Sequence, residues 1–176
     1  NPLTITGNAV LGDGTADSVT GITTLSVSGT TLIRTATITS TGSQTYSGAV
    51  TVGADTTLTA SDTNAVVRMA DAVNSDSTST PRALSVTASG SSGNAVLDGT
   101  VGASAPLRTL AVTASDIDLN GGAVTTTSTQ TYTGPVTLGA DTTLTGAGIT
   151  LGSSLNSDGT ARSLAINDSG TTTLTG

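Results

Sequence analysis

The sequence of 176 residues contains no histidine, cysteine, lysine, glutamate, phenylalanine or tryptophan. General bases, thiolate nucleophiles, Schiff-base amines and soft metal ligands come mostly from these missing residue types. Most enzyme classes are therefore excluded, and we expect neither catalytic residues nor a cofactor. The absence of cysteine also excludes a disulfide framework. No apolar run is long enough to cross a bilayer.

Basic residues are scarce as well. Five arginines stand against twelve aspartates, which gives a formal net charge of -7. Nucleic acids and anionic membranes bind clustered basic residues, so this balance argues against both as partners. The abundant residues are small: 40 Thr, 22 Ser and 22 Gly. Because 35% of the residues are hydrophobic and only 10% are charged, the composition favours low-charge β structure over disorder.

The chain contains an internal repeat. Residues 38–60 read ITSTGSQTYSGAVTVGADTTLTA, and residues 124–146 read VTTTSTQTYTGPVTLGADTTLTG, at an offset of 86. Further matching pairs lie on both sides of this block at offsets between 86 and 80, so the copies differ by short loop insertions. We interpret residues 1–176 as one continuous domain built from two modules, roughly 7–92 and 93–176.

Within each module, apolar residues recur two positions apart and are bounded by Gly, Asn, Asp or Ser, which predicts short strands. A β-sandwich is one alternative, but its core gap of about 10 Å needs bulky inward side chains. The narrow interior of a β-solenoid suits Val, Leu, Ile and Ala better. The sequence therefore predicts an all-β, right-handed parallel β-helix of about eight coils of about 20–22 residues, with about four coils per module.

The segments QTYSGAVTVGADTTLT (44–59) and QTYTGPVTLGADTTLT (130–145) resemble repeats in filamentous-haemagglutinin-like surface proteins of bacteria. The resemblance covers essentially the whole chain. It implies a secreted β-helical rod at the bacterial cell surface that acts in adhesion, aggregation or biofilm formation. On this basis we expect a structural segment from the interior of a longer fibre or adhesin. Its expected partners are neighbouring repeats or copies of itself, end to end, and host or matrix glycans.

Tyr46 and Tyr132 are the only aromatic residues, and each follows Gln-Thr at the same module position. A tyrosine on the face of a rod could stack on a sugar ring, which makes both residues candidate ligand contacts. The alternative is that each tyrosine covers a corner of its coil and leaves its hydroxyl group in water.

Acidic and basic residues recur together near the corners of predicted strands. Asp76 lies shortly before Arg82, and Asp158 lies shortly before Arg162. Each arginine precedes a Leu-x-(Val/Ile) strand, where an inward charge would be costly. We expect a loop ion pair in each module, worth at most about 1 kcal/mol if exposed. A site for an anionic ligand is the alternative.

Asp116 and Asp118 lie on one side of a predicted strand, about 6.6 Å apart along the chain. Such a pair could bind Ca²⁺, could serve a polysaccharide-cleaving enzyme, or could simply be solvated. Because Thr31 and Ile33 take the equivalent positions in the first module, the pair does not belong to the repeat. We expect a solvated pair.

Threonine alternates with other residues in two runs, Thr35/37/39/41 and Thr125/127/129/131/133. Regular threonines on a flat β-solenoid face can bind ice, as in antifreeze proteins with a Thr-x-Thr motif. Such a face needs the same threonine pair in register on every coil. The two runs lie a module apart and the repeat offset changes, which argues against register. Ice or carbohydrate binding by a threonine-rich face is kept as the alternative function.

Overall fold

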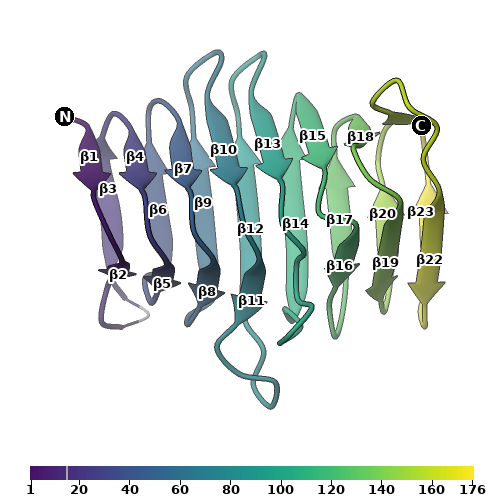
Figure 1. Ribbon diagram of the computed structural model, residues 1–176, viewed down its shortest axis with the longest axis horizontal. Helices are drawn as coiled ribbons and strands as arrows, with labels where there is room; N and C mark the ends of the chain where they lie inside the picture. The colour runs from purple at the N-terminus through teal and green to yellow at the C-terminus, as the bar shows by residue number, and fades with distance from the viewer. Residues whose placement is uncertain (15) are drawn as a thin grey trace.

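In the computed structural model, which describes residues 1–14 and 16–176, the chain forms a continuous β-solenoid of about eight coils without any helix among those residues (Figure 1). Each coil contributes short strands to three sides of the rod, which we call faces A, B and C. All the paired strands run parallel to each other. The predicted all-β solenoid is therefore confirmed.

Face A is one sheet with a strand from each coil: β1 (Leu3–Ile5), β4 (Leu25–Val27), β7 (Gln44–Tyr46), β10 (Val66–Met69), β13 (Asn94–Leu97), β15 (Asp116–Leu119), β18 (Val136–Leu138) and β21 (Leu155–Ser157). Face C is a second such sheet: β3 (Ser18–Ile22), β6 (Thr37–Ser40), β9 (Thr56–Ala60), β12 (Ala83–Ala88), β14 (Thr109–Ala114), β17 (Gln130–Thr133), β20 (Ile149–Leu151) and β23 (Thr172–Leu174).

Face B consists of two sheets that meet at Val101, which forms bridges to Val73 and Val124. The first sheet has four strands: β2 (Ala9–Leu11), β5 (Thr31–Ile33), β8 (Val50–Val52) and β11 (Val73–Ser75). The second sheet has three strands: β16 (Ala123–Thr125), β19 (Thr142–Gly146) and β22 (Leu164–Asp168).

The coils differ in length. Along face A, Leu25 pairs with Gln44 at a separation of 19 residues, whereas Val67 pairs with Ala95 at a separation of 28 residues. The longest coil includes loop 76–82, which projects from the rod after β11 (Figure 1). With neighbouring strands about 4.8 Å apart, eight coils make a rod about 40 Å long.

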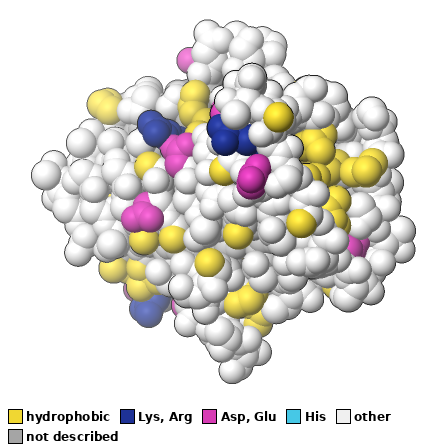
Figure 2. Space-filling view, turned by 45° about the vertical axis from the view of Figure 1, so that its right-hand side comes forward, with side chains coloured by type: hydrophobic (Ala, Val, Ile, Leu, Met, Phe, Trp, Pro, Cys, Tyr) yellow, Lys and Arg dark blue, Asp and Glu magenta, His cyan; other side chains and the backbone are white. Residues whose placement is uncertain are grey.

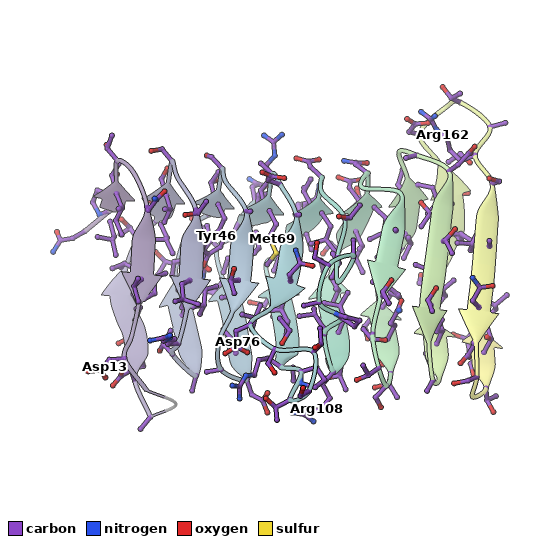
Figure 3. The ribbon with its side chains drawn as sticks, turned by 60° about the horizontal axis from the view of Figure 1, so that its bottom comes forward. Asp13, Tyr46, Met69, Asp76, Arg108 and Arg162 are labelled. Carbon is purple, nitrogen blue, oxygen red and sulfur yellow. The ribbon has the colours of Figure 1, made fainter. Side chains whose placement is uncertain are left out.

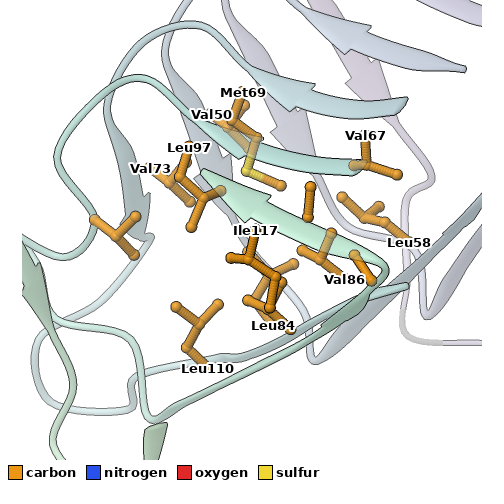
Figure 4. Packing of buried hydrophobic residues seen from close by; sticks show 14 of the residues in the cluster. Val50, Leu58, Val67, Met69, Val73, Leu84, Val86, Leu97, Leu110 and Ile117 are labelled. Carbon is orange, nitrogen blue, oxygen red and sulfur yellow. The ribbon is translucent and has the colours of Figure 1, made fainter. Parts of the chain in front are cut away.

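The interior is one hydrophobic cluster that runs along the rod. Strands alternate between inward and outward residues, as in β9, where Thr56, Leu58 and Ala60 are buried and the two threonines between them are partly exposed. Inward residues of successive coils stack on one another, and Figure 4 shows this packing around Met69 and Ile117. Short side chains therefore fill the narrow core in rows.

The sequence repeat does not correspond to a whole number of coils. The Gln-Thr-Tyr segment of the first copy is β7 on face A, but its counterpart begins β17 on face C. The neighbouring strands shift in the same direction, from β8 on face B to β18 on face A and from β9 on face C to β19 on face B. The second copy is therefore rotated by one face about the rod axis.

A coil has three strand positions, and Val101 occupies the face-B position of its own coil. On this count, each strand of the second copy lies eleven positions after its counterpart, which is three and two-thirds coils. The prediction of about four coils per module is therefore close, but the module is one strand short of a whole number of coils. A segment can change face between the two copies because every strand follows the same inward and outward alternation, so that a strand's own sequence does not specify a face.

One corner of the rod requires glycine. Gly134 follows β17 with a φ of 135°, a backbone conformation that other residues rarely adopt. A Cβ atom at this position would also collide with the carbonyl oxygen of Ala114 in the preceding coil. The close approach of stacked corners therefore depends on the missing side chain.

Candidate functional site

Both tyrosines lie inside the rod. Tyr46 and Tyr132 are 0% exposed, and Figure 3 shows Tyr46 between the faces of the coil. The predictions that they contact a ligand at the surface, or cover a corner with the hydroxyl group in water, are wrong. Each tyrosine occupies an inward row; Tyr46, for example, pairs with Val27 and Met69 in the adjacent strands. Burial raises the pKa of both phenols.

A buried glutamine satisfies the tyrosine hydroxyl group in the first copy. The Gln44 amide nitrogen donates to the Ile38 carbonyl at 3.2 Å, to the Ser40 hydroxyl at 3.2 Å and to the Thr59 carbonyl at 2.9 Å. The Tyr46 hydroxyl donates to the Gln44 side-chain oxygen at 3.0 Å. We call this arrangement the glutamine lock. It connects three strands of two coils, and the side chains of Gln44 and Tyr46 at its centre are fully buried.

The second copy contains the same lock on another face. Gln130 donates to the carbonyls of Val124 and Thr145 at 3.2 and 2.8 Å and to the Thr126 hydroxyl at 3.3 Å. Tyr132 donates to Gln130 at 2.9 Å. The Gln-Thr-Tyr repeat was the sequence signal for this structural role, since residues two apart on a strand face the same side.

The structure brings both predicted Asp-Arg pairs together. Arg82 Nε lies 2.9 Å from Asp76 Oδ1, and an Arg162 terminal nitrogen lies 2.9 Å from Asp158 Oδ2. In each pair, a second hydrogen bond makes the contact bidentate. The hydrogen bond from Arg162 is the main cause that lowers the pKa of Asp158. Both pairs remain partly accessible to solvent, so each adds little to stability.

Two further charged contacts connect coils and were not predicted. Arg108 pairs with Asp55, which lies two coils earlier. Arg68 contacts Asp98 at 2.6 Å, and Asn120 donates to the other oxygen of Asp98 at 2.8 Å. Burial opposes the charge of Asp98, but the bonds from Asn120 and Arg68 keep its pKa below the ordinary value. Figure 2 shows such Arg and Asp side chains in small groups on a largely uncharged surface.

Asp116 and Asp118 both lie on the outer side of β15. Asn94 donates to Asp118 at 2.9 Å. Burial, followed by the charge of Asp118, raises the pKa of Asp116. Across residues 1–14 and 16–176, no group of three or more acidic, histidine or cysteine side chains could hold a metal ion. Two carboxylates alone fall short of the six to eight oxygen ligands that Ca²⁺ takes.

Outward residues on face C form two rows, which together we call the threonine array. The rows cross β6, β9, β12, β14 and β17, and adjacent members pair in strict register. The first row is Thr37, Thr57, Ser85, Ala111 and Thr131, and the second row is Thr39, Thr59, Thr87, Thr113 and Thr133. All ten residues are partly or fully exposed.

The expectation that the two threonine runs are out of register is therefore wrong for part of each run. Thr37 and Thr39 share face C with Thr131 and Thr133, because the one-face rotation brings β17 of the second copy onto that face. Thr125, from the same run as Thr131, lies instead in β16 on face B. The strands of face C contain no charged residue.

Comparisons with known proteins found no matching family model, no matching curated protein and no matching solved structure. The fold alone thus defines the class, which is that of a β-helical repeat protein. Over the described part of the chain, no helix has the length and apolar character needed to span a membrane.

Proposed function

We propose that the chain is a rigid structural segment of an extracellular bacterial fibre or adhesin, which acts at the cell surface in adhesion, aggregation or filament assembly. The supporting observation is the hydrophobic cluster that continues through the coils without a break. The resemblance of segments 44–59 and 130–145 to filamentous-haemagglutinin-like repeats supports the extracellular assignment. The role is mechanical and requires neither a catalytic residue nor a cofactor.

Stiffness follows from how the coils are connected. Parallel strand pairing joins each coil to the next on three sides, and the two glutamine locks add side-chain hydrogen bonds between coils. A bend at one coil would break pairing and open the core on the opposite side. Because each coil contacts only its neighbours, further coils lengthen the rod without a new core.

The two ends of the rod are the proposed contacts with neighbouring repeats or with another copy of the chain. In the first coil, Leu3, Ile5 and Val19 are only partly buried against the core. In the last coil, Leu155 is 37% exposed and Leu174 is 63% exposed. Another coil stacked on either end would cover these side chains and pair the open strand edges. The next repeat of the same chain and a second molecule of the protein would both be bound in this way, by burial of these side chains and by strand pairing.

The test is electron microscopy and sedimentation of the purified chain over a concentration series. We expect rods that lengthen by end-to-end addition. Leu174→Lys puts a charge on the inward row of the terminal edge and should abolish this growth, whereas the outward neighbour Thr173→Lys should preserve it. Unchanged short rods at every concentration would contradict self-association, and strongly curved or flexible particles would contradict the rigid rod itself.

A further inference from the structure

Face C differs chemically from the other two faces. Its second outward row is threonine on five successive strands, and eight of the ten residues of the threonine array are threonine. Outward residues on face A instead include Arg68, Asp116 and Asp118. Outward residues on face B include Val10, Leu32 and Asn74.

The rotation of the repeat provides an internal control for this array. Thr87, Thr113 and Thr133 of the second row lie on face C, and their repeat counterparts lie on the other faces. Those counterparts are Asn167 on face B and Ser28 and Ser47 on or beside face A. At these three positions threonine follows the face and not the repeat. The counterparts of Thr39, Thr57, Thr59 and Thr131 are also threonine and lie on the other faces. Duplication therefore explains part of the array but not its complete second row.

The array is regular in two dimensions. Neighbours along a row are about 4.8 Å apart, and the two rows are about 6.6 Å apart along the strands. Threonine is branched at Cβ and has few rotamers in a strand, so each residue presents a methyl and a hydroxyl group in a fixed position. Strand pairing and the packed core below hold the rows in place.

Such a surface orders water. The hydroxyl groups bond to water molecules, while the methyl groups restrict the water above them. Because the array repeats with two fixed spacings over five coils, it fits a partner that also repeats in two dimensions. A single soluble molecule does not repeat in this way, and a neutral surface does not match an ionic mineral. We propose that the threonine array on face C binds the surface of ice.

This proposal is independent of the structural role. Its test is the thermal hysteresis of the purified chain, together with inhibition of ice recrystallisation. The central variant is Thr59→Lys, whose register neighbours are Thr39 and Thr87 in the array. The matched control is Thr145→Lys, its repeat counterpart on face B, with Thr125 and Asn167 as neighbours. Both side chains are partly exposed, and both backbone carbonyls accept a bond from a lock glutamine.

We expect hysteresis from the unmodified chain, loss of most of it in Thr59→Lys, and retention in Thr145→Lys. Circular dichroism of both variants checks that they are folded. Absence of hysteresis in the folded unmodified chain, or an equal loss in the two folded variants, would overturn the proposal. Retention on chitin or cellulose particles that Thr59→Lys abolishes, without any hysteresis, would overturn it in favour of a crystalline polysaccharide.

Discussion

The glutamine lock allows a sharp test of how the core is held together. In Gln44→Ala, the two N–H groups of the amide, which share three acceptors, are lost together with the acceptor of the Tyr46 hydroxyl group. At a net value of about 1 kcal/mol for each of these three donated hydrogens, the loss is about 3 kcal/mol. The tyrosine hydroxyl group, which is left buried without an acceptor, adds about 1–3 kcal/mol. We therefore expect a loss of at least about 4 kcal/mol in the free energy of unfolding.

The assay is urea unfolding followed by circular dichroism, with Tyr46→Phe as the partner in a double-mutant cycle. Alone, Tyr46→Phe should destabilise the rod by about 1–2 kcal/mol, because Gln44 loses a partner. In the Gln44→Ala background, the same change should be neutral or stabilising, because it removes an unsatisfied hydroxyl group. The surface change Thr45→Ala on the same strand is the control and should stay within about 0.5 kcal/mol.

Two results would refute this reasoning. A loss below about 1 kcal/mol in Gln44→Ala would mean that the lock contributes no more than a single ordinary hydrogen bond. An equal effect of Tyr46→Phe in both backgrounds would mean that the two side chains are not coupled. In either case, the stability of the coils would come from the aliphatic rows alone.

Burial raises the pKa of Tyr46 and Tyr132. The contribution of these buried phenols to the free energy of unfolding should therefore be fully present below the unfolded-state pKa of about 10, and should decrease as the pH rises above it. An alkaline absorbance titration should show ionisation only together with unfolding; phenolate in the folded protein would contradict this. Asp168 accepts three backbone N–H bonds, which lower its pKa. The stabilisation of the folded protein by the ionised Asp168 carboxylate should be present above about pH 3.9 and should be lost as the pH falls through the folded-state pKa. Hydrogen exchange should therefore show that Asp168→Ala loosens the last coils at neutral pH but not in strong acid, and an equal effect at both pH values would refute this. Gly134→Ala should lower the melting temperature more than Gly7→Ala, which has a positive φ but open space around it; equal shifts would contradict the predicted collision.

Much of the fold could be predicted because the information is local. Apolar residues two apart, separated by small polar residues, specify short strands, and the missing large aromatic residues favour a narrow interior. The number of coils then follows from the repeat length of 86 residues and the length of about 20–22 residues that is typical of a solenoid coil. The ion pairs could also be located, because an arginine two residues before an inward leucine would face the core in an unbroken strand, and therefore has to sit at a corner.

The remaining features depend on position within the coil, which no single strand encodes. Tyr46 and Tyr132 are predicted at the surface, where a phenol can leave its hydroxyl group in water. The glutamine two residues earlier makes burial possible, because it occupies the same inward row and accepts a hydrogen bond from the hydroxyl group. The register of the threonine array was missed for another reason: it depends on the total number of strands between Thr39 and Thr133, and not on the spacing within either run.

Each repeat copy lies eleven strand positions after the previous copy, which couples the number of repeats in such a rod to the direction in which its distal coils face. Recombination between repeats can delete or duplicate one unit. Each such event turns everything downstream by one third of a revolution relative to everything upstream, because eleven strands leave the chain one face short of four coils. Three units, or eleven whole coils, restore the original direction. Length variants that differ by one repeat would thus present their distal parts to three different sides, even though their sequences were otherwise identical.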